Sequence, residues 1–187
     1  MDLNTEENRK ELIAVFKKLE TDSHFEITSP KDDGYNCIAW AMGFNDRWVD
    51  HFIDTSSKKK WWPNGVKRGK SPVNLVEAFK AVGFETCDDD GTEDGFDKVA
   101  LYKDMDSGRW THAAKVLSPL KYHSKIGKSF DITHRSGDVF ENSSYGTVFQ
   151  FMKRKVSDRH IIEDIMRKNE PQTFDIDNIV KQILGFF

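Results

Sequence analysis

The chain has only two cysteines, Cys37 and Cys87, among 187 residues. Two thiols cannot form the disulfide framework of a small secreted scaffold, and their sequence settings differ. There is also no closely spaced ligand pair, such as Cys-x-x-Cys or His-x-x-x-His. We therefore expect free thiols in a reducing compartment and no metal ion or other cofactor.

Long apolar runs are absent as well. No stretch approaches the roughly 20 apolar residues needed to span a bilayer. The first 20 residues have neither a basic start nor the apolar core of a secretory signal. These absences predict a cytoplasmic protein that does not enter membranes.

Charge of one sign is not in excess, because the formal net charge is −3 and the isoelectric point is about 6.1. No global field therefore attracts nucleic acid or an anionic membrane. The sequence does contain 14 Phe and 5 Trp, which argue against a disordered chain. We expect one domain over residues 1–187, the default at this length.

Helical spacing of apolar residues occurs near both ends of the chain. The first helix is predicted over 4–19, with Asn4 and Glu7 as an Asn-led capping box. A second helix should begin after Ser71 and end at Gly83. The pattern returns within 155–187, which we interpret as a C-terminal helical extension.

Strand-like alternation dominates the middle of the chain. Three segments, 96–102, 110–117 and 145–152, are predicted strands, and Gly108 lies in the first connection, where a hairpin turn would need it. A shorter strand is expected over 120–126. Helices flanking a run of strands are typical of an α+β fold.

Cys37 begins a short apolar segment, 37–42, which Asn36 can cap and Gly43 can end. A thiol at a helix start gains from the helix dipole and from free backbone N–H groups, which lower its pKa from about 8.5. The Cys37 amide could also help to form an oxyanion hole. A small buried core residue fits the same apolar neighbours.

His112 is the candidate partner of this thiol. Alternation along its strand places His112 on the same face as Trp110 and Ala114. A hydrogen-bonded core histidine remains an alternative. However, a helix-borne Cys followed by a strand-borne His is the order found in papain-like hydrolases, which points to Cys37 as nucleophile and His112 as base.

A third polar group would orient the imidazole through its second nitrogen. Ser124 or His123 on the next strand come first, followed by Asp131, with His134 just beyond it. The sequence does not choose among them.

Aromatic and polar residues near the nucleophile are candidates for substrate contact. Asn36 is a candidate oxyanion donor or helix cap, and Tyr35 a candidate wall or hydroxyl donor. The full set of expected substrate-contacting residues is Tyr35, Asn36, Trp40, Trp61 and Trp62.

Several blocks in a fixed order resemble an uncharacterised bacterial domain family with a YNCIAWA motif. The match covers roughly residues 32–154 and names no activity. Its blocks lie at residues 33–41, 61–63, 76–79, 95–102, 111–114, 124–127, 131–134 and 145–148.

The Cys and His placement is also distantly similar to papain-like and NlpC-type cysteine hydrolases. That resemblance implies a central antiparallel sheet packed by helices, with additional helices at both ends of the chain. It also implies a polar third residue on the strand after the histidine, which here is Ser124 or His123. Where NlpC-type enzymes have Asp-Cys-Ser-Gly, this chain has Asn-Cys-Ile-Ala at 36–39.

The resulting hypothesis is a cysteine hydrolase or acyltransferase that cleaves an amide, peptide or ester bond in a peptide or protein substrate. The alternative is a non-catalytic protein-binding or immunity-like module that uses the tryptophan-rich loop within 44–70. One minor alternative is a metal site built from Cys37, His112 and His134 or His123. Another is a nucleic-acid site at the basic residues 58–60, 67, 68 and 70. The oligomeric state stays open.

Overall fold

The structure is a computed structural model that describes residues 2–52, 60–135, 137–141 and 143–169. Its main feature is a sheet of seven strands in which every pair of neighbours is antiparallel. In spatial order the strands are β1 (Glu26–Ile27), β8 (Asp131–His134), β7 (Lys121–Lys125), β6 (Trp110–Ser118), β5 (Phe96–Lys103), β9 (Thr147–Lys155) and β4 (Glu85–Cys87).

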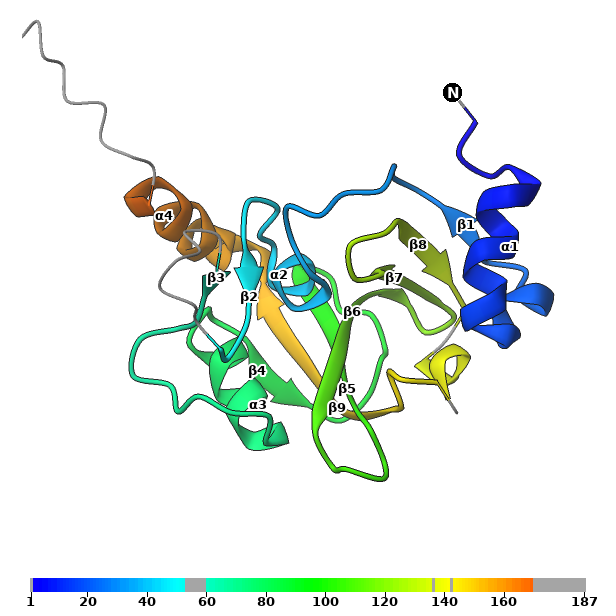
Figure 1. Cartoon of the computed structure of the whole chain (residues 1–187). Coiled ribbons are helices and arrows are strands. Elements are labelled where there is room, and N and C mark those ends of the chain that lie inside the picture. The colour runs from blue at the N-terminus through cyan, green and yellow to red at the C-terminus, as the bar shows by residue number, and fades with distance from the viewer. Residues whose placement is uncertain (1, 53–59, 136, 142, 170–187) are drawn as a thin grey trace, which may run out of the picture.

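In the part of the chain that the structure describes, four α-helices pack around this sheet (Figure 1). They are α1 (Glu6–Val15), α2 (Cys37–Met42), α3 (Pro72–Lys80) and α4 (His160–Asn169). Short 3₁₀ turns cover Lys17–Thr21, Gly137–Phe140 and Val156–Arg159, and two short parallel strands, β2 (Trp48–Val49) and β3 (Lys60–Trp61), lie in the long loop. This mixture confirms the predicted α+β class.

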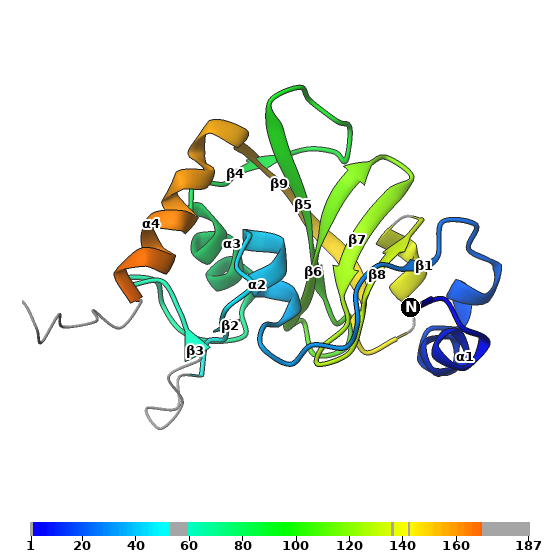
Figure 2. The same ribbon diagram turned by 90° about the horizontal axis from the view of Figure 1, so that it is seen from above.

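The sheet separates two hydrophobic cores. Figure 2 shows α2, α3 and α4 on one side and α1 on the other. Strand β6 supplies Ala113 to the core under α2 and α3, and Ala114 to the core next to α1. Adjacent residues thus enter opposite cores, as the alternation of a strand requires.

The caps of α2 and α3 are those that the sequence predicts. Asn36 Oδ1 accepts a hydrogen bond from the Ala39 amide at 3.0 Å, and Gly43 ends α2 with φ of 108°. Pro72 stands in the first turn of α3, and Gly83 follows that helix with φ of 90°. Both glycines adopt the left-handed conformation, which side chains disfavour.

The start of α1 was predicted wrongly. Its cap is Thr5, which accepts from the Asn8 amide at 3.3 Å, and not Asn4. Asn4 instead uses its amide group to bond both backbone groups of Ile27, at 2.8 and 3.0 Å. The side chain is therefore occupied by β1, and the α-helix ends at Val15 before a 3₁₀ turn.

The four predicted strands are present with small shifts of their ends, and the helical pattern after 155 gives α4. The rest of the expected helical extension, 170–187, and residues 58–59 of the basic run lie outside the described residues. Within the described part of the chain, no helix is both long enough and apolar enough to cross a membrane.

Candidate functional site

Cys37 is the first residue of α2, and this helix lies against β6 and β7. The pairing between β6 and β7 ends at Lys115 and His123, so the Ala113 amide lies beyond the part of β6 that pairs with β7. The backbone of Ala113 forms a hydrogen bond with the thiol of Cys37. The sulfur therefore lies beside the strand residue that follows His112.

The environment of Cys37 makes it a protonated thiol at neutral pH. Burial raises its pKa to about 11, although backbone hydrogen bonds from Ala113 and Ile38 and the charge of Lys70 act in the opposite direction. The sequence predicted a lowered pKa from the helix start alone. That prediction is wrong, because loss of hydration outweighs the backbone donors.

His112 is fully buried in an aromatic cage. Its ring stacks on Tyr145 with 4.1 Å between centroids and an interplanar angle of 8°. The rings of Tyr102 and Phe140 approach it edge-on, each at 5.2 Å. Burial holds the pKa of His112 well below its usual value, so the imidazole is neutral.

The two ring nitrogens of His112 have different environments. Nε2 lies 3.0 Å from Ser124 Oγ, and the same hydroxyl lies 2.8 Å from His134 Nε2. Nδ1 is buried and has no hydrogen-bond partner among the described residues. One nitrogen is thus held in place and the other is left with an unused lone pair or proton.

Of the predicted orienting residues, the structure brings Ser124 to His112. His123 lies elsewhere, with its Nε2 2.8 Å from Thr28 Oγ1. Asp131 accepts a hydrogen bond from the Tyr35 hydroxyl at 2.9 Å and has Lys125 Nζ at 3.9 Å. We therefore assign Asp131 to a buried structural network.

Cys37 and His112 belong to neighbouring but different packing environments. Cys37 is part of the core under α2 and α3, whereas His112 packs against aromatic rings of the other core. Tyr145 lies between them, because it stacks on His112 and interacts electrostatically with Cys37. Burial raises the pKa of Tyr145, and Cys37 raises it further. Neither ring nitrogen is hydrogen bonded to the sulfur in the described structure.

The predicted substrate contacts have mostly structural partners. Asn36 bonds both backbone groups of Val49 in addition to capping α2. Trp62 is buried and stacks on Trp110 with 6.2 Å between centroids. Trp61 packs on Phe44.

Trp40 is half-buried, as are Asn36 and Trp61. The Trp40 ring contacts Tyr35 and His123, and Lys115 Nζ lies 3.6 Å from its centroid.

The sequence interpretation missed Tyr145 and Lys70. Lys70 lies over the Trp110 ring at 3.6 Å and interacts electrostatically with Cys37. The signal for Tyr145 was the glycine after it, since Gly146 has φ of 71° and a Cβ there would overlap the Lys103 carbonyl. The close approach of the Gly146 backbone to Lys103 therefore fixes the position of the neighbouring residue, Tyr145.

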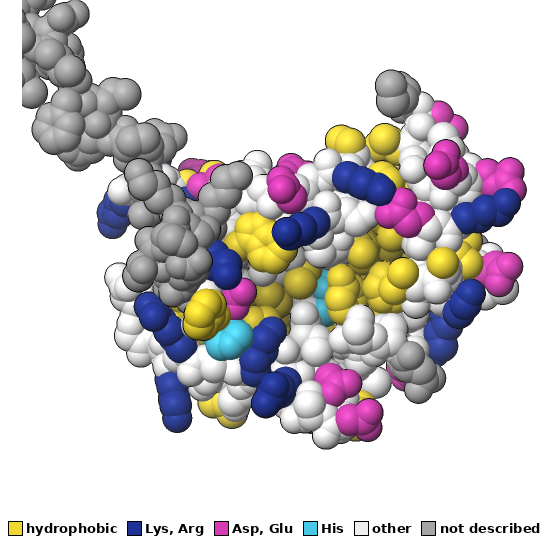
Figure 3. All heavy atoms as spheres, in the orientation of Figure 1, with side chains coloured by type: hydrophobic (Ala, Val, Ile, Leu, Met, Phe, Trp, Pro, Cys, Tyr) yellow, Lys and Arg dark blue, Asp and Glu magenta, His cyan; other side chains and the backbone are white. Residues whose placement is uncertain are grey.

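Figure 3 shows hydrophobic side chains gathered across the middle of one face, with Lys and Arg side chains around them. The two thiols are free. Among the described residues there is no group of three or more His, Cys, Asp or Glu that could hold a metal ion. The metal alternative at Cys37 and His112 therefore has no ligand set in this part of the chain.

A protein-family comparison matches residues 26–153 to a domain of unknown function, DUF7689. The chain belongs to this family. The match includes Cys37, His112 and Ser124 and ends within β9. No curated protein and no solved structure matches the chain. Membership of DUF7689 therefore supplies no activity, and any function has to be argued from the site.

Proposed function

We propose that this DUF7689 protein is a cysteine hydrolase or acyltransferase with a papain-like core, acting on an amide, peptide or ester bond. Cys37 is the nucleophile, His112 the general base and acid, and Ser124 the residue that orients His112. The observation that carries the proposal is the asymmetry of the His112 ring. Ser124 engages Nε2, while Nδ1 has no partner among the described residues.

This asymmetry sets the tautomer that the reaction needs. With the proton on Nε2, His112 donates to Ser124 Oγ, and the Ser124 hydroxyl can donate to His134 Nε2. Nδ1 then carries a lone pair and can accept a proton. A general base oriented through its other nitrogen is the arrangement of the cysteine and serine hydrolases.

The resting pair is a neutral thiol and a neutral imidazole, since burial raises the pKa of Cys37 and lowers that of His112. Proton transfer therefore accompanies attack. As the sulfur bonds to the carbonyl carbon, its proton moves to His112 Nδ1. The same proton then passes to the leaving nitrogen or oxygen as its bond to carbon breaks, which leaves a thioester on Cys37.

The second half-reaction distinguishes the two activities. Water attacks the thioester in a hydrolase, whereas an amine or hydroxyl acceptor attacks it in an acyltransferase. In both cases His112 removes the proton of the attacking group and returns it to the Cys37 sulfur. No cofactor takes part in this scheme.

The position of the backbone supports the same assignment. Cys37 is the first residue of α2, where amides of the first turn have no partner within the helix. Asn36 Oδ1 occupies the Ala39 amide. The Cys37 and Ile38 amides lie near the sulfur and lower the pKa of the thiol, as donors for a developing oxyanion would.

A panel of peptide, amide and ester substrates with chromogenic leaving groups tests the proposal. Wild-type protein should release the leaving group, Cys37→Ala should lose this activity, and the matched variant Cys87→Ala should keep it. Cys87 is a suitable control because it lies on the edge strand β4, whereas Cys37 lies on α2 against β6 and β7.

A second candidate is a non-catalytic protein-binding module that keeps the fold. It is favoured by the burial of both Cys37 and His112, whose exposed fractions are 8% and 0%. Absence of turnover across the panel, with unchanged binding of a partner by Cys37→Ala, would favour this module over the enzyme.

A further inference from the structure

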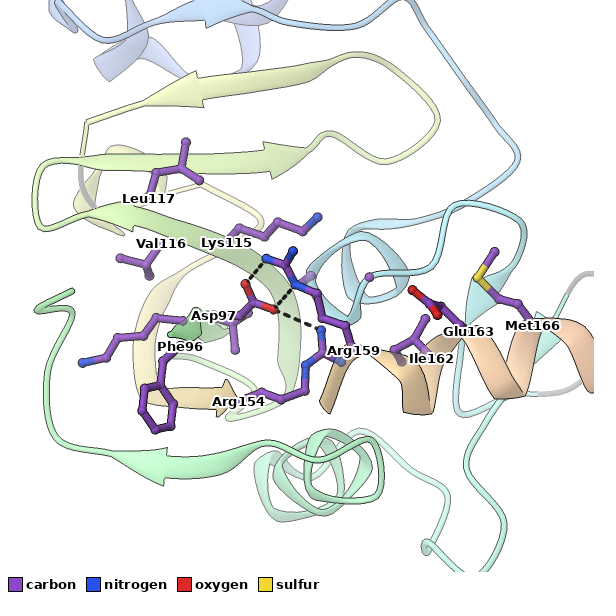
Figure 4. A pocket seen from close by; sticks show the side chains of 14 residues that line it. Phe96, Asp97, Lys115, Val116, Leu117, Arg154, Arg159, Ile162, Glu163 and Met166 are labelled. Carbon is purple, nitrogen blue, oxygen red and sulfur yellow. Dashed lines mark hydrogen bonds and ion pairs between the residues drawn. The ribbon is translucent and has the colours of Figure 1, made fainter. Parts of the chain in front are cut away.

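A cavity of about 490 Å³ lies at the far end of α2 from Cys37. Ala41 and Gly43 line it from α2, and Ile162 and Met166 line it from α4. Its volume is within the range of small-molecule sites, about 300–1,000 Å³. Figure 4 shows charged side chains of β5, β6, β9 and the turn before α4 converging on it.

Two arginines in the cavity share one aspartate. Arg159 Nε donates to Asp97 Oδ2 at 2.8 Å, and Arg154 Nη2 approaches the same oxygen at 3.4 Å. Asp97 lies between the two guanidinium groups (Figure 4). One carboxylate thus faces two cations.

Arg154 has a structural duty as well. Its Nη1 donates to the backbone carbonyls of Met42 and Val82. Met42 is the last residue of α2, and Val82 lies just after α3. The side chain is 4% exposed, and its Nε has no hydrogen-bond partner among the described residues. A buried guanidinium with an unused donor favours an acceptor in the adjoining cavity.

Lys115 is the third cation and has no acidic partner in the described part of the chain. Its Nζ lies 3.6 Å from the Trp40 ring centroid and forms no ion pair or hydrogen bond with a described residue. Burial lowers its pKa to about 8, with Asp97 and Asp131 opposing and Arg154 and Arg159 assisting this shift. Lys115 is therefore mostly charged at pH 7.

Part of the remaining wall is apolar. Val99 lines the cavity from the sheet, and Ile162 and Met166 line it from α4. Lys98 lines it too, but its ammonium group is paired with Asp89 and Glu93. Glu163 also lines it but forms no ion pair with Lys115. The site therefore combines an uncompensated cation with an apolar surface, which suits a ligand that has one charged end.

We propose that this cavity binds an organic anion, whose carboxylate or phosphate group contacts Lys115 and Arg159 and whose apolar body lies along α4. Arg159 already binds both oxygens of Asp97 through Nε and Nη2, so its Nη1 group is the donor that remains for the head group. Lys115 supplies the unpaired charge, and Trp40 holds its side chain in position. This site is separate from the Cys37 and His112 pair and does not depend on the proposed activity.

The test is a titration of the full chain with octanoate, followed by calorimetry and by methyl resonances of Val99, Ile162 and Met166. We expect saturable binding and shifts of these methyl groups. Octyl phosphate in a parallel titration distinguishes the two head groups, and tighter binding of either one identifies it. Equal binding of uncharged 1-octanol would overturn the proposal.

Variants localise the charge. Lys115→Met keeps the aliphatic stem and should weaken octanoate binding at least tenfold, whereas Lys115→Arg should retain it. Lys103→Met is the matched control, because Lys103 lies on β5 outside the cavity. Unchanged binding by Lys115→Met would overturn the proposal. If that variant does not fold, absence of methyl shifts in the wild-type protein remains a decisive contrary result.

Discussion

The Nε2 atom of His112 lies 3.0 Å from the Oγ atom of Ser124, and this hydroxyl also lies 2.8 Å from His134. One buried hydroxyl thus joins two imidazoles from different strands. Because a hydroxyl has one proton to donate, it can accept from one ring and donate to the other. This relationship orients the His112 ring, and Nδ1 has no hydrogen-bond partner among the described residues.

Ser124→Ala should therefore destabilise the protein. The substitution leaves ring nitrogens of His112 and His134 without their shared partner, which should lower the free energy of unfolding by about 1–3 kcal/mol. Urea denaturation measures this change. Ser118→Ala is the matched control on β6 and should have little effect; equal losses in both variants would contradict the role of the Ser124 hydroxyl.

Acid should destabilise the protein through His112. Its pKa is lowered in the folded state, so the unfolded chain binds more protons as the pH falls below about 6.5. Stability should then decrease by up to about 1.4 kcal/mol per pH unit for this group. His112→Gln should reduce that slope in urea denaturation between pH 6.5 and pH 5, while the exposed His160→Gln should retain it. An unchanged slope in His112→Gln would show that His112 is not held neutral.

Cys37 should react slowly with iodoacetamide at pH 7. With a pKa of about 11, about one thiol in 10,000 is ionised, and the side chain is buried. Cys87 is only partly buried, and we expect it to be alkylated first. Peptide mapping by mass spectrometry gives the two rates, and that of Cys37 should rise about tenfold per pH unit up to pH 10. Faster labelling of Cys37 at pH 7 would contradict the buried neutral thiol.

Gly146→Ala should be more harmful than Gly95→Ala. Both glycines have positive φ, 71° and 80°, which costs alanine roughly 1–2 kcal/mol. A Cβ at Gly95 meets no atom within 4 Å, whereas a Cβ at Gly146 would overlap the backbone of Lys103. The Gly146 variant should therefore lose more stability in thermal denaturation. Similar losses would mean that the turn next to Tyr145 can relax.

Much of the fold could be predicted from local patterns. The long strands β5, β6 and β9 each have 8 or 9 residues, enough for alternation to be visible. Strands β1, β4 and β8 have 2 to 4 residues and were missed. Such short segments are strands because the neighbouring strand pairs with them, which is a tertiary effect that local propensity does not contain.

The choice between Ser124 and His123 depended on register. Lys115 pairs with His123, and residues directly opposite each other share a face of the sheet. His112 lies three residues before Lys115 and so faces the other side, together with Ser124. The sequence identified both candidates, but only the pairing of β6 with β7 decides between them.

The sign of the Cys37 pKa shift could not be predicted either. A helix start is visible in the sequence and lowers the pKa of a thiol. The depth of burial is set by how α2 packs on β6 and β7, and in this protein burial has the larger effect.

The central claim is that Cys37 accepts an acyl group with His112 as its base. The most direct measurement is mass spectrometry of the protein after brief exposure to p-nitrophenyl acetate, in a Cys87→Ala background. We predict one acetyl group on Cys37, formed about 10²–10⁴ times more slowly when His112→Gln is added. Acetylation of Cys37 at the same rate in a folded His112→Gln variant, or none on Cys37 in the wild-type protein, would contradict the account.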